Sequence, residues 1–445
     1  MHLNAAGMDV GADAHWVAVP PDRDEEPVRR FGAFTAALYA LAAWLRQCQI
    51  ETVVLESTGV SWMTLFAVLE ERGFAVKLVD AHHARQVPGR KTDVQDCQWL
   101  QELHTSGVLQ GAFRPEEQVG VLRRSLRQRR RLVAMASRAV QPMQQALEQM
   151  HLKWTEGVSD MNGKTGMEII HAMLAGERDP QRLASHRDRR CQPDQATIAK
   201  ALEGPWRAEQ RLALPQALEQ YEFLQQPLRA CETQIAACLQ TFVTHVEVEP
   251  PQTTPARQRR SRQRQAPSCD VHGYLHALTG GDLTQIDGLD ALTALKVISE
   301  SGLDMTRWPT GKHCASWLGW CPGNKVSGGK RYRIRSKPTA HRAASALRLA
   351  AQGLVKSHSA LGAYERRMRA RLGAPKAMTA TAHKLARLVY SMLRYGTAYV
   401  DAGQPAYEQK YRDRVLTNLQ RKARVLGYQL VHVADPGSAQ AAATL

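Results

Sequence analysis

Short β-type runs alternate with helical segments over the first 114 residues, and this alternation limits the fold more than any other feature of the sequence. The pattern predicts strands at 8–10, 15–19, 52–55 and 74–79, and helices at 36–47 and 61–73. Such an order indicates an open α/β sheet covered by helices, in which ligands bind at the strand ends. Two acidic residues stand at such ends, Asp9 in the first run and Glu56 directly after the third. Asp13, in the following turn, is a rival to Asp9, but Asp9 is favoured because it lies on the strand itself.

A second acidic pair opens the next helix. Thr92 and Gln95 match a capping box, in which Thr92 is the N-cap and the Gln95 side chain reaches back to it. Asp93 and Asp96 then fall in the first turn and project from one face, where the helix dipole favours their ionised forms. Two ionised carboxylates repel each other unless a cation lies between them. Because hard divalent cations such as Mg²⁺ prefer oxygen ligands and assist phosphodiester chemistry, these acidic groups predict a metal site that acts on nucleic acid.

The charge balance points to the same class of partner. The chain has 445 residues, with 59 Lys and Arg against 42 Asp and Glu, and its formal net charge of +17 favours binding to DNA or RNA. Aromatic residues make up only 6%, so phosphate contacts are expected to outweigh base stacking. The eight cysteines form no CxxC pair and have no histidine at zinc spacing, which indicates a reduced setting. Without a signal peptide or a membrane-spanning apolar run, we expect a soluble intracellular protein with no membrane partner.

Residues 115–246 are predicted to form a basic helical and coiled-coil region, although 155–210 read as irregular and polar. A group of arginines within a few helical turns is interpreted as a surface that follows phosphates, with a solvated helix face as the alternative. The group consists of Arg123, Arg124, Arg127, Arg129, Arg130 and Arg131.

Further along this region, apolar residues recur at near-heptad spacing, which predicts a coiled-coil or bundle helix despite Pro215 and Pro227. The repeat is interpreted as a packing or dimerisation stripe, and the helix that carries it is a candidate assembly element. Its members are Leu214, Leu218, Tyr221, Leu224, Leu228, Ile235 and Leu239.

The Pro- and Arg-rich stretch 247–272 is predicted to be a flexible basic linker, because it cannot bury a core. It leads into a mainly α-helical domain at 273–432, with a short strand at 427–431 and a disordered tail at 433–445. Within this domain, residues 286–294 look like a helix-hairpin-helix element, whose turn would present backbone N–H groups to a phosphate. DNA contact and simple packing are equally good readings of that segment.

The segment 318–331 carries a serine, Ser327, directly before two glycines that permit close backbone approach to a substrate. Cations around a serine could hold a phosphate and stabilise the transition state of attack on phosphorus. On chemistry alone, a glycine turn that binds phosphate passively is the simpler explanation. The cations are Lys325, Lys330, Arg331, Arg333 and Arg335.

Several of these segments together resemble the IS110-family transposases. They are MDVGADAHWVAV, VLESTG and KTDVQDCQWL, followed by IDGLDALTALKVISE, ASWLGWCPGNKVSGGK and ALRLAAQGL. Members of that family pair an N-terminal RuvC-like domain of the RNase H fold with a C-terminal, serine-bearing transposase domain. The resemblance covers residues 1 to about 150 and about 280 to 432, and its motifs are specific in order and spacing.

The resemblance implies a set of residues and partners. Asp9, Glu56, Asp93 and Asp96 would form a DEDD tetrad that binds Mg²⁺, with Mn²⁺ as a substitute, and Ser327 would attack DNA and become covalently phosphorylated. The family's bridge RNA, a noncoding transcript of the element, would specify both target and donor DNA. Composite active sites in a dimer or tetramer are also implied, in a bacterial cytoplasm at the nucleoid.

The sequence departs from the family in two places. The middle, about 155–275, is longer than in compact members, and the hairpin reads Gly-Leu-Asp where Gly-Ile-Gly is more usual. Two other functions share parts of the pattern. A RuvC-like junction nuclease would use the tetrad and water without a serine intermediate, and a noncatalytic nucleic-acid-binding protein would use neither.

Overall fold

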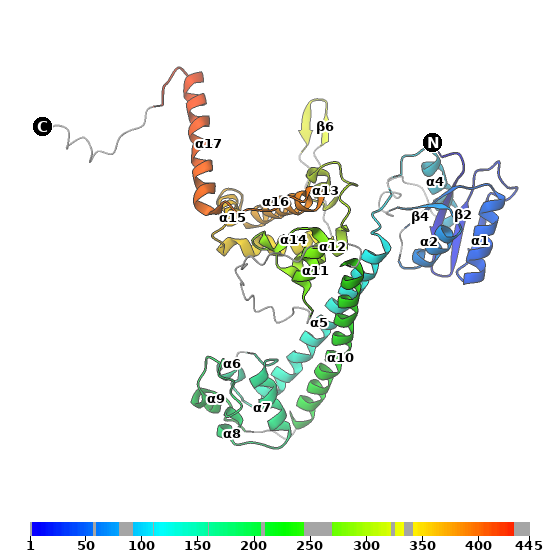
Figure 1. Cartoon of the computed structure of the whole chain (residues 1–445). Helices are drawn as coiled ribbons and strands as arrows, with labels where there is room; N and C mark the ends of the chain where they lie inside the picture. The colour runs from blue at the N-terminus through cyan, green and yellow to red at the C-terminus, as the bar shows by residue number, and fades with distance from the viewer. Residues whose placement is uncertain are drawn as a thin grey trace, which may run out of the picture. The chain divides into compact units, whose positions relative to one another are not determined.

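The computed structural model describes residues 2–56, 59–79, 92–109, 111–158, 160–205, 210–243, 269–321, 325–332 and 341–430. The chain forms two compact units, residues 1–114 and 115–445 (Figure 1). The predicted linker 247–272 falls largely outside the described residues, as does the tail 433–445.

The first unit is built on a five-stranded sheet in the order β3-β2-β1-β4-β5. β1, β4 and β5 are parallel, whereas β2 and β3 run antiparallel to their neighbours. The mixed α/β class is therefore as predicted, but β3 was missed by the sequence pattern because its half-exposed residues do not alternate in burial. The strands are β1 (Ala5–Val10), β2 (Ala14–Ala18), β3 (Val28–Gly32), β4 (Thr52–Glu56) and β5 (Ala75–Val79).

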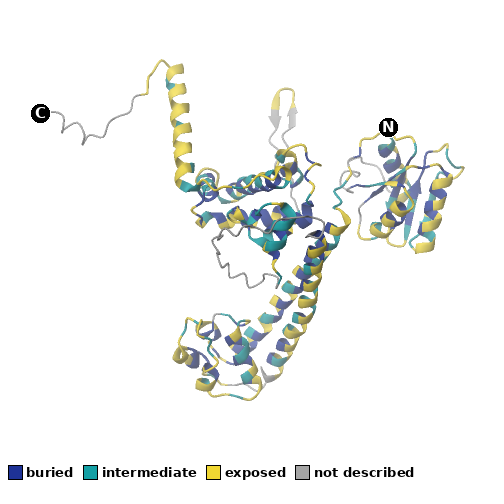
Figure 2. Cartoon of the chain, in the orientation of Figure 1, coloured by how far each residue is buried: buried dark blue, intermediate teal, exposed yellow. Residues whose placement is uncertain are grey.

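Helices cover both faces of this sheet. On one face, α1 (Thr35–Gln47) and α2 (Trp62–Glu71) bury the larger apolar core against side chains such as Met8 of β1. On the other face, α4 (Asp93–Thr105) packs on Val54 and neighbouring residues. Figure 2 shows the strands buried between these layers. Because successive side chains of a strand point to opposite faces, alternate residues of β1 contact either the first layer or α4.

One glycine explains how closely α4 approaches the sheet. A Cβ atom placed on Gly7 of β1 would overlap the backbone of Cys97 and Gln101 in α4. Only glycine therefore allows this helix to rest directly on the strand. The contact also shows that Gly7, and with it Asp9 two residues on, faces α4 rather than the α1–α2 layer.

The second unit contains two long helices, α5 (Glu117–Gln149) and α10 (Gln210–Val243), which pack antiparallel along their length. Between them, Arg129 and Glu232 form a buried ion pair with an N–O distance of 2.7 Å. The two side chains are only 7% and 9% exposed. A buried charge pair of this kind favours one register of the two helices, since a slip would leave both charges unpaired.

The predicted apolar stripe from Leu214 to Leu239 lies on α10, which continues through Pro215 and Pro227. Its members pack on α5 of the same chain, for example Leu214 and Leu218 beside Met143. The stripe is thus a packing surface within the chain, and its use in dimerisation stays a prediction.

The prediction that 155–210 are irregular is also wrong. This segment folds into four short helices, and their apolar side chains share a core with the adjoining ends of α5 and α10 (Figure 1). Helices of four to eleven residues are too short to show a clear 3.6-residue period, which explains the missed prediction. They are α6 (Trp154–Gly157), α7 (Lys164–Leu174), α8 (Pro180–Ala184) and α9 (Gln195–Ala201).

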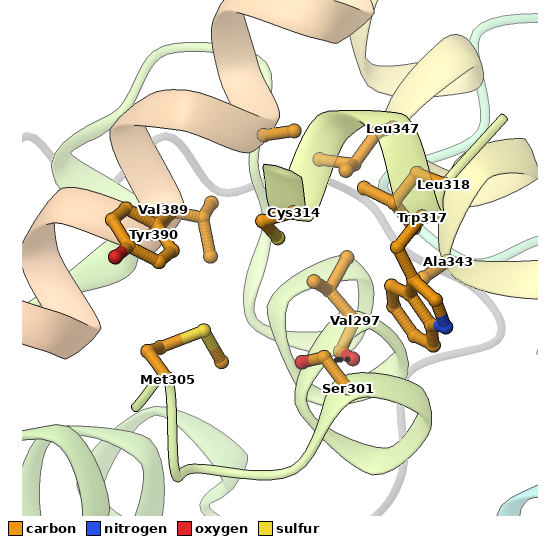
Figure 3. A pocket seen from close by; sticks show the side chains of 11 residues that line it. Val297, Ser301, Met305, Cys314, Trp317, Leu318, Ala343, Leu347, Val389 and Tyr390 are labelled. Atoms are coloured by element: carbon orange, nitrogen blue, oxygen red, sulfur yellow. Dashed lines mark hydrogen bonds between the residues drawn. The ribbon is translucent and has the colours of Figure 1, made fainter. Parts of the chain in front are cut away.

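The C-terminal part is mainly helical, as predicted, and its core includes the first turns of α5 and the last turns of α10. A small apolar cavity lies between α12, α13, α14 and α16, lined by Val297, Trp317 and Tyr390 among others (Figure 3). At about 10 Å³ it is at the lower limit for one water molecule. The helices are α11 (Val271–Thr279), α12 (Ala291–Ser301), α13 (Gly311–Trp317), α14 (Arg342–Gly353), α15 (Ala360–Leu372), α16 (Ala374–Tyr395) and α17 (Gly403–Val425), with 3₁₀ turns η1 (Leu283–Gln285) and η2 (Leu354–Lys356).

Residues 286–290 connect η1 to α12, and the Asp290 side chain caps α12 by accepting from the backbone N–H of Thr293. Gly288 has a φ of 90°, and a Cβ there would press on the carbonyl of Ala350 in α14. The glycine is thus explained by packing, and the helix-hairpin-helix assignment stays a prediction. The described residues 427–430 are not in a strand. Among the helices that the structure describes, none has the length and apolar character to cross a membrane.

Candidate metal centre and serine hairpin

Two of the predicted carboxylates lie side by side at the ends of neighbouring parallel strands. β1 and β4 pair in register from Ala5 with Thr52 to Met8 with Leu55. The same register, one residue further, places Asp9 beside Glu56. Glu56 is only 6% exposed, and Asp9 is half-buried.

The other two carboxylates come from the first turn of α4. The Thr92 hydroxyl accepts a hydrogen bond from the backbone N–H of Gln95 at 3.3 Å, so this half of the predicted capping box is present. The cap fixes the start of the helix at Asp93, and Asp96 follows on the same turn. Because Gly7 lets α4 rest on β1, this first turn lies close to the end of the strand that carries Asp9.

The pKa of Asp9 reflects its burial and the closeness of the other three carboxylates. Burial, as the largest cause, and the negative charges of Glu56, Asp93 and Asp96 together raise the pKa of Asp9 from 3.8 to about 6. A backbone hydrogen bond at Val10 opposes the rise. The structure thus brings the four predicted acidic residues into one electrostatic neighbourhood, in which ionised Asp9 is destabilised.

The donor set suits a hard cation. All four side chains offer carboxylate oxygens, the ligands that Mg²⁺, Ca²⁺ and Mn²⁺ prefer, and none offers sulfur or imidazole. Within the described part of the chain, no three His, Cys, Asp or Glu side chains already stand close enough together to enclose an ion. Burial is the largest cause of the raised pKa of Asp9, and the repulsion from the other three carboxylates that adds to it is what a bound cation would relieve. Asp13, the rival to Asp9, lies exposed in the turn between β1 and β2.

Ser327 lies at the end of a β-hairpin formed by β6 (Lys325–Ser327) and β7 (Lys330–Tyr332). Ser327 pairs with Lys330, so Gly328 and Gly329 alone make the turn, with φ values of 56° and 75°. A two-residue turn with both φ values positive is the type I′ geometry that favours glycine. The glycine pair therefore has a structural cause, and Ser327 and Lys330 are exposed on either side of it.

Of the cations predicted around Ser327, Lys325 and Arg331 lie on the two strands of the hairpin. Arg333 and Arg335 lie outside the described residues.

The arginine group on α5 has mixed surroundings. Arg123 donates to the backbone carbonyls of Ser299 and Glu300, and Arg127 binds the Glu300 carboxylate at 2.7 Å. Arg129 is buried against Glu232, so its place on a phosphate-binding surface is wrong. Sequence patterns did not reveal these partners, because Glu300 is 173 residues from Arg127.

Arg124, Arg130 and Arg131 are exposed on α5, as is part of Arg127. Contact of Arg123, Arg124 and Arg127 with nucleic acid stays a prediction.

The segment with the four carboxylates and the segment with the serine hairpin each match a known transposase family. Residues 6–152, which include the four carboxylates, match a transposase family of the DEDD type. The chain is therefore a transposase, an enzyme that recombines DNA. Residues 281–366, which include the serine hairpin, match the family described as Transposase IS116/IS110/IS902, and the chain belongs to the IS110 family of transposases. The comparison with curated proteins finds no match.

Proposed function

We propose that this transposase moves an insertion element by metal-assisted strand cleavage and exchange, with Ser327 as the nucleophile. The observation that carries the proposal is the convergence of Asp9, Glu56, Asp93 and Asp96 in an otherwise basic protein, where burial and the neighbouring charges together raise the pKa of Asp9. Acidic side chains that repel one another are retained where a cation is to be held.

The sheet order supports an RNase H-like fold for residues 1–114. Three strands form an antiparallel meander, and two further strands add in parallel beside the first. In this arrangement Asp9 and Glu56 stand at the carboxyl ends of adjacent strands, which is the usual position of a ligand site in an open sheet. The four carboxylates would hold Mg²⁺ or Mn²⁺ there, and the bound metal would neutralise negative charge on a scissile phosphate.

The exposed position of Ser327 on the hairpin supports a serine step. The Ser327 oxygen attacks phosphorus, forming an O–P bond as the P–O3′ bond breaks, while its proton passes to water and the leaving O3′ takes one up. The phosphoserine keeps the energy of the broken linkage, so attack by a DNA 3′ hydroxyl can reseal it. Lys330, opposite Ser327 across the turn, is placed to neutralise a phosphate that reaches the hairpin.

The substrates are DNA at a target and a donor site, and the resemblance to the family extends the proposal to a bridge RNA that specifies both. Active sites completed between protomers of a dimer or tetramer belong to the same proposal. The exposed arginines of α5, Arg124, Arg127 and Arg130, support contact with a polyanion along this helix.

The serine assignment is tested with Ser327→Ala. Because Ser327 is exposed at the end of β6, the variant should fold normally and bind DNA, yet form no covalent protein–DNA adduct on a denaturing gel. Ser345→Ala, at an exposed serine of α14, is the matched control and should form adducts at the wild-type level. Adducts that persist in Ser327→Ala would refute the nucleophile.

The same experiment separates the two alternative functions. A hydrolytic junction nuclease would cleave DNA equally well with Ser327→Ala, and no protein would be attached to the product. A noncatalytic binding protein would show no metal-dependent cleavage at all. Asp93→Asn, in the exposed first turn of α4, should abolish cleavage with little effect on folding if the tetrad is catalytic.

A further inference from the structure

A row of functional side chains crosses the sheet at the level of the acidic residues. Asp9 of β1 lies opposite Trp16 of β2, and Trp16 lies opposite Arg30 of β3. Residues directly opposite each other in antiparallel strands point to the same face of the sheet. Glu56, Asp9, Trp16 and Arg30 thus follow one another over four adjacent strands.

This row is on the face that carries the candidate metal centre. Gly7 faces α4, and Asp9, two residues on, shares its direction. Conversely, Val17 of β2 lies in the core with α1 and α2, so the adjacent residue Trp16 points to the α4 side. The row is therefore one surface, in which an aromatic ring stands beside the carboxylates and a cation beyond it.

The side chains of Trp16 and Arg30 are available to a ligand. Trp16 is partly exposed, and among the described residues it makes no hydrogen bond or ring contact. Arg30 is exposed and makes no ion pair within the same part of the chain.

Its neighbour Arg29 behaves in the opposite way. Arg29 binds Asp24 at 2.8 Å and lies 5.1 Å from the centre of the Trp44 ring. One of two adjacent arginines is thus structural, and the other is available on the opposite face.

The spacing suits a nucleic-acid strand that runs across the sheet. Adjacent strands lie about 4.8 Å apart, so Trp16 is one step from Asp9 and Arg30 about 10 Å away. Proteins bind single strands by stacking bases on aromatic rings and by pairing phosphates with cations. Along such a strand, the carboxylates would lie at the scissile phosphate, the indole at the adjacent base and the guanidinium at the next phosphate.

We propose that Trp16 stacks on the base next to the scissile linkage and that Arg30 binds the following phosphate, so that the DNA strand crosses β1, β2 and β3. This inference rests on the proposed cleavage at the acidic site. It assigns two substrate-positioning residues and the direction in which the strand leaves the site.

Photo-crosslinking of the full-length protein tests the stacking. The probe is a single-stranded oligodeoxynucleotide that carries 5-iododeoxyuridine. It is bound to the protein in the presence of Ca²⁺ and irradiated, and the adducts are mapped by peptide mass spectrometry. We expect an adduct at Trp16 in the wild type and in Asp93→Asn, and its transfer to the new ring in Trp16→Phe. Trp16→Leu should lose it, while Tyr39→Leu, at an exposed ring of α1 on the other side of the sheet, should keep it.

Activity gives the second measurement. Since a stacked base contributes about 1–3 kcal/mol, Trp16→Leu should lower kcat/KM for cleavage by about 5- to 150-fold and Trp16→Phe by much less. Arg30→Gln should weaken crosslinking at Trp16 and reduce its salt dependence by about one counterion, whereas Arg72→Gln, on the α2 side, should not.

The outcomes separate this inference from the proposed function. No adduct at Trp16 in the wild type, or an adduct only with an iodouridine-containing RNA, overturns the DNA path even if metal-dependent cleavage is normal. Normal crosslinking at Trp16 without metal-dependent cleavage overturns the proposed function instead. Unchanged thermal unfolding of Trp16→Leu would show that any loss arises from substrate contact.

Discussion

Replacing Asp9 by Asn should stabilise the metal-free protein. The pKa of Asp9 is raised from 3.8 to about 6 by burial and by the charges of Glu56, Asp93 and Asp96. At 1.36 kcal/mol per pKa unit, a difference of about 2 corresponds to about 3 kcal/mol of destabilisation at neutral pH. Because Asp9 is only half-buried, screening by water reduces this to about 1–2 kcal/mol.

The sign follows from the two protonation states. The folded protein holds the Asp9 proton more tightly than the unfolded chain does, so the folded state loses stability as the pH rises from about 4 to about 6. The penalty is complete above pH 6. Asp9→Asn should therefore gain its full 1–2 kcal/mol at about pH 7.5, roughly half of that at about pH 5, and nothing below about pH 4.

Amide hydrogen exchange in the presence of EDTA measures this effect locally. Peptides that cover β1 and β4 should exchange about 5- to 30-fold more slowly in Asp9→Asn than in the wild type at neutral pH. Adding Mg²⁺ should slow exchange in the wild type and not in the variant, since binding to the folded state alone stabilises it. Asp13→Asn, in the exposed turn, should change neither measurement. Equal or faster exchange in Asp9→Asn at neutral pH would refute the destabilisation of ionised Asp9 on which the metal assignment depends.

Three further substitutions test the architecture. Gly7→Ala should destabilise the first unit by more than about 3 kcal/mol by thermal unfolding, because the new methyl group meets the backbone of α4, whereas Gly32→Ala, with its nearest contact at 3.8 Å, should have little effect. Glu232→Gln should cost about 3–5 kcal/mol by leaving Arg129 buried and unpaired, and replacing both residues with leucine should recover most of that loss. Thr92→Ala should cost about 1 kcal/mol and lower the affinity for Mg²⁺ measured by calorimetry, since the cap holds the first turn of α4; unchanged affinity would argue against a role for that turn.

The local signals in the sequence were reliable where one element determines its own shape. The helix start at Thr92 follows from a side chain and a backbone group three residues apart, and the short buried strands follow from apolar runs between turns. The candidate site could be predicted for the same reason, because its carboxylates stand at the ends of such elements.

Long-range partners could not be predicted in this way. The apolar stripe of α10 indicated a packed face but not that α5 would cover it. Likewise, arginines on α5 indicated charge but not that Arg129 would be buried on Glu232. The periodicity of a helix predicts which of its faces is apolar, but the element that packs on that face is known only from the fold.

The long antiparallel pair of helices has a consequence for how this protein can change in length. A helix of 33 residues extends about 50 Å, and α10 returns over the same distance. Adding residues to one helix alone would separate Arg129 from Glu232 by a turn and expose apolar side chains on both partners. Length variants of the α5–α10 pair that still fold should therefore gain or lose residues in both helices together, in multiples of about seven. Each such step would change the length of the helix pair by about 10 Å.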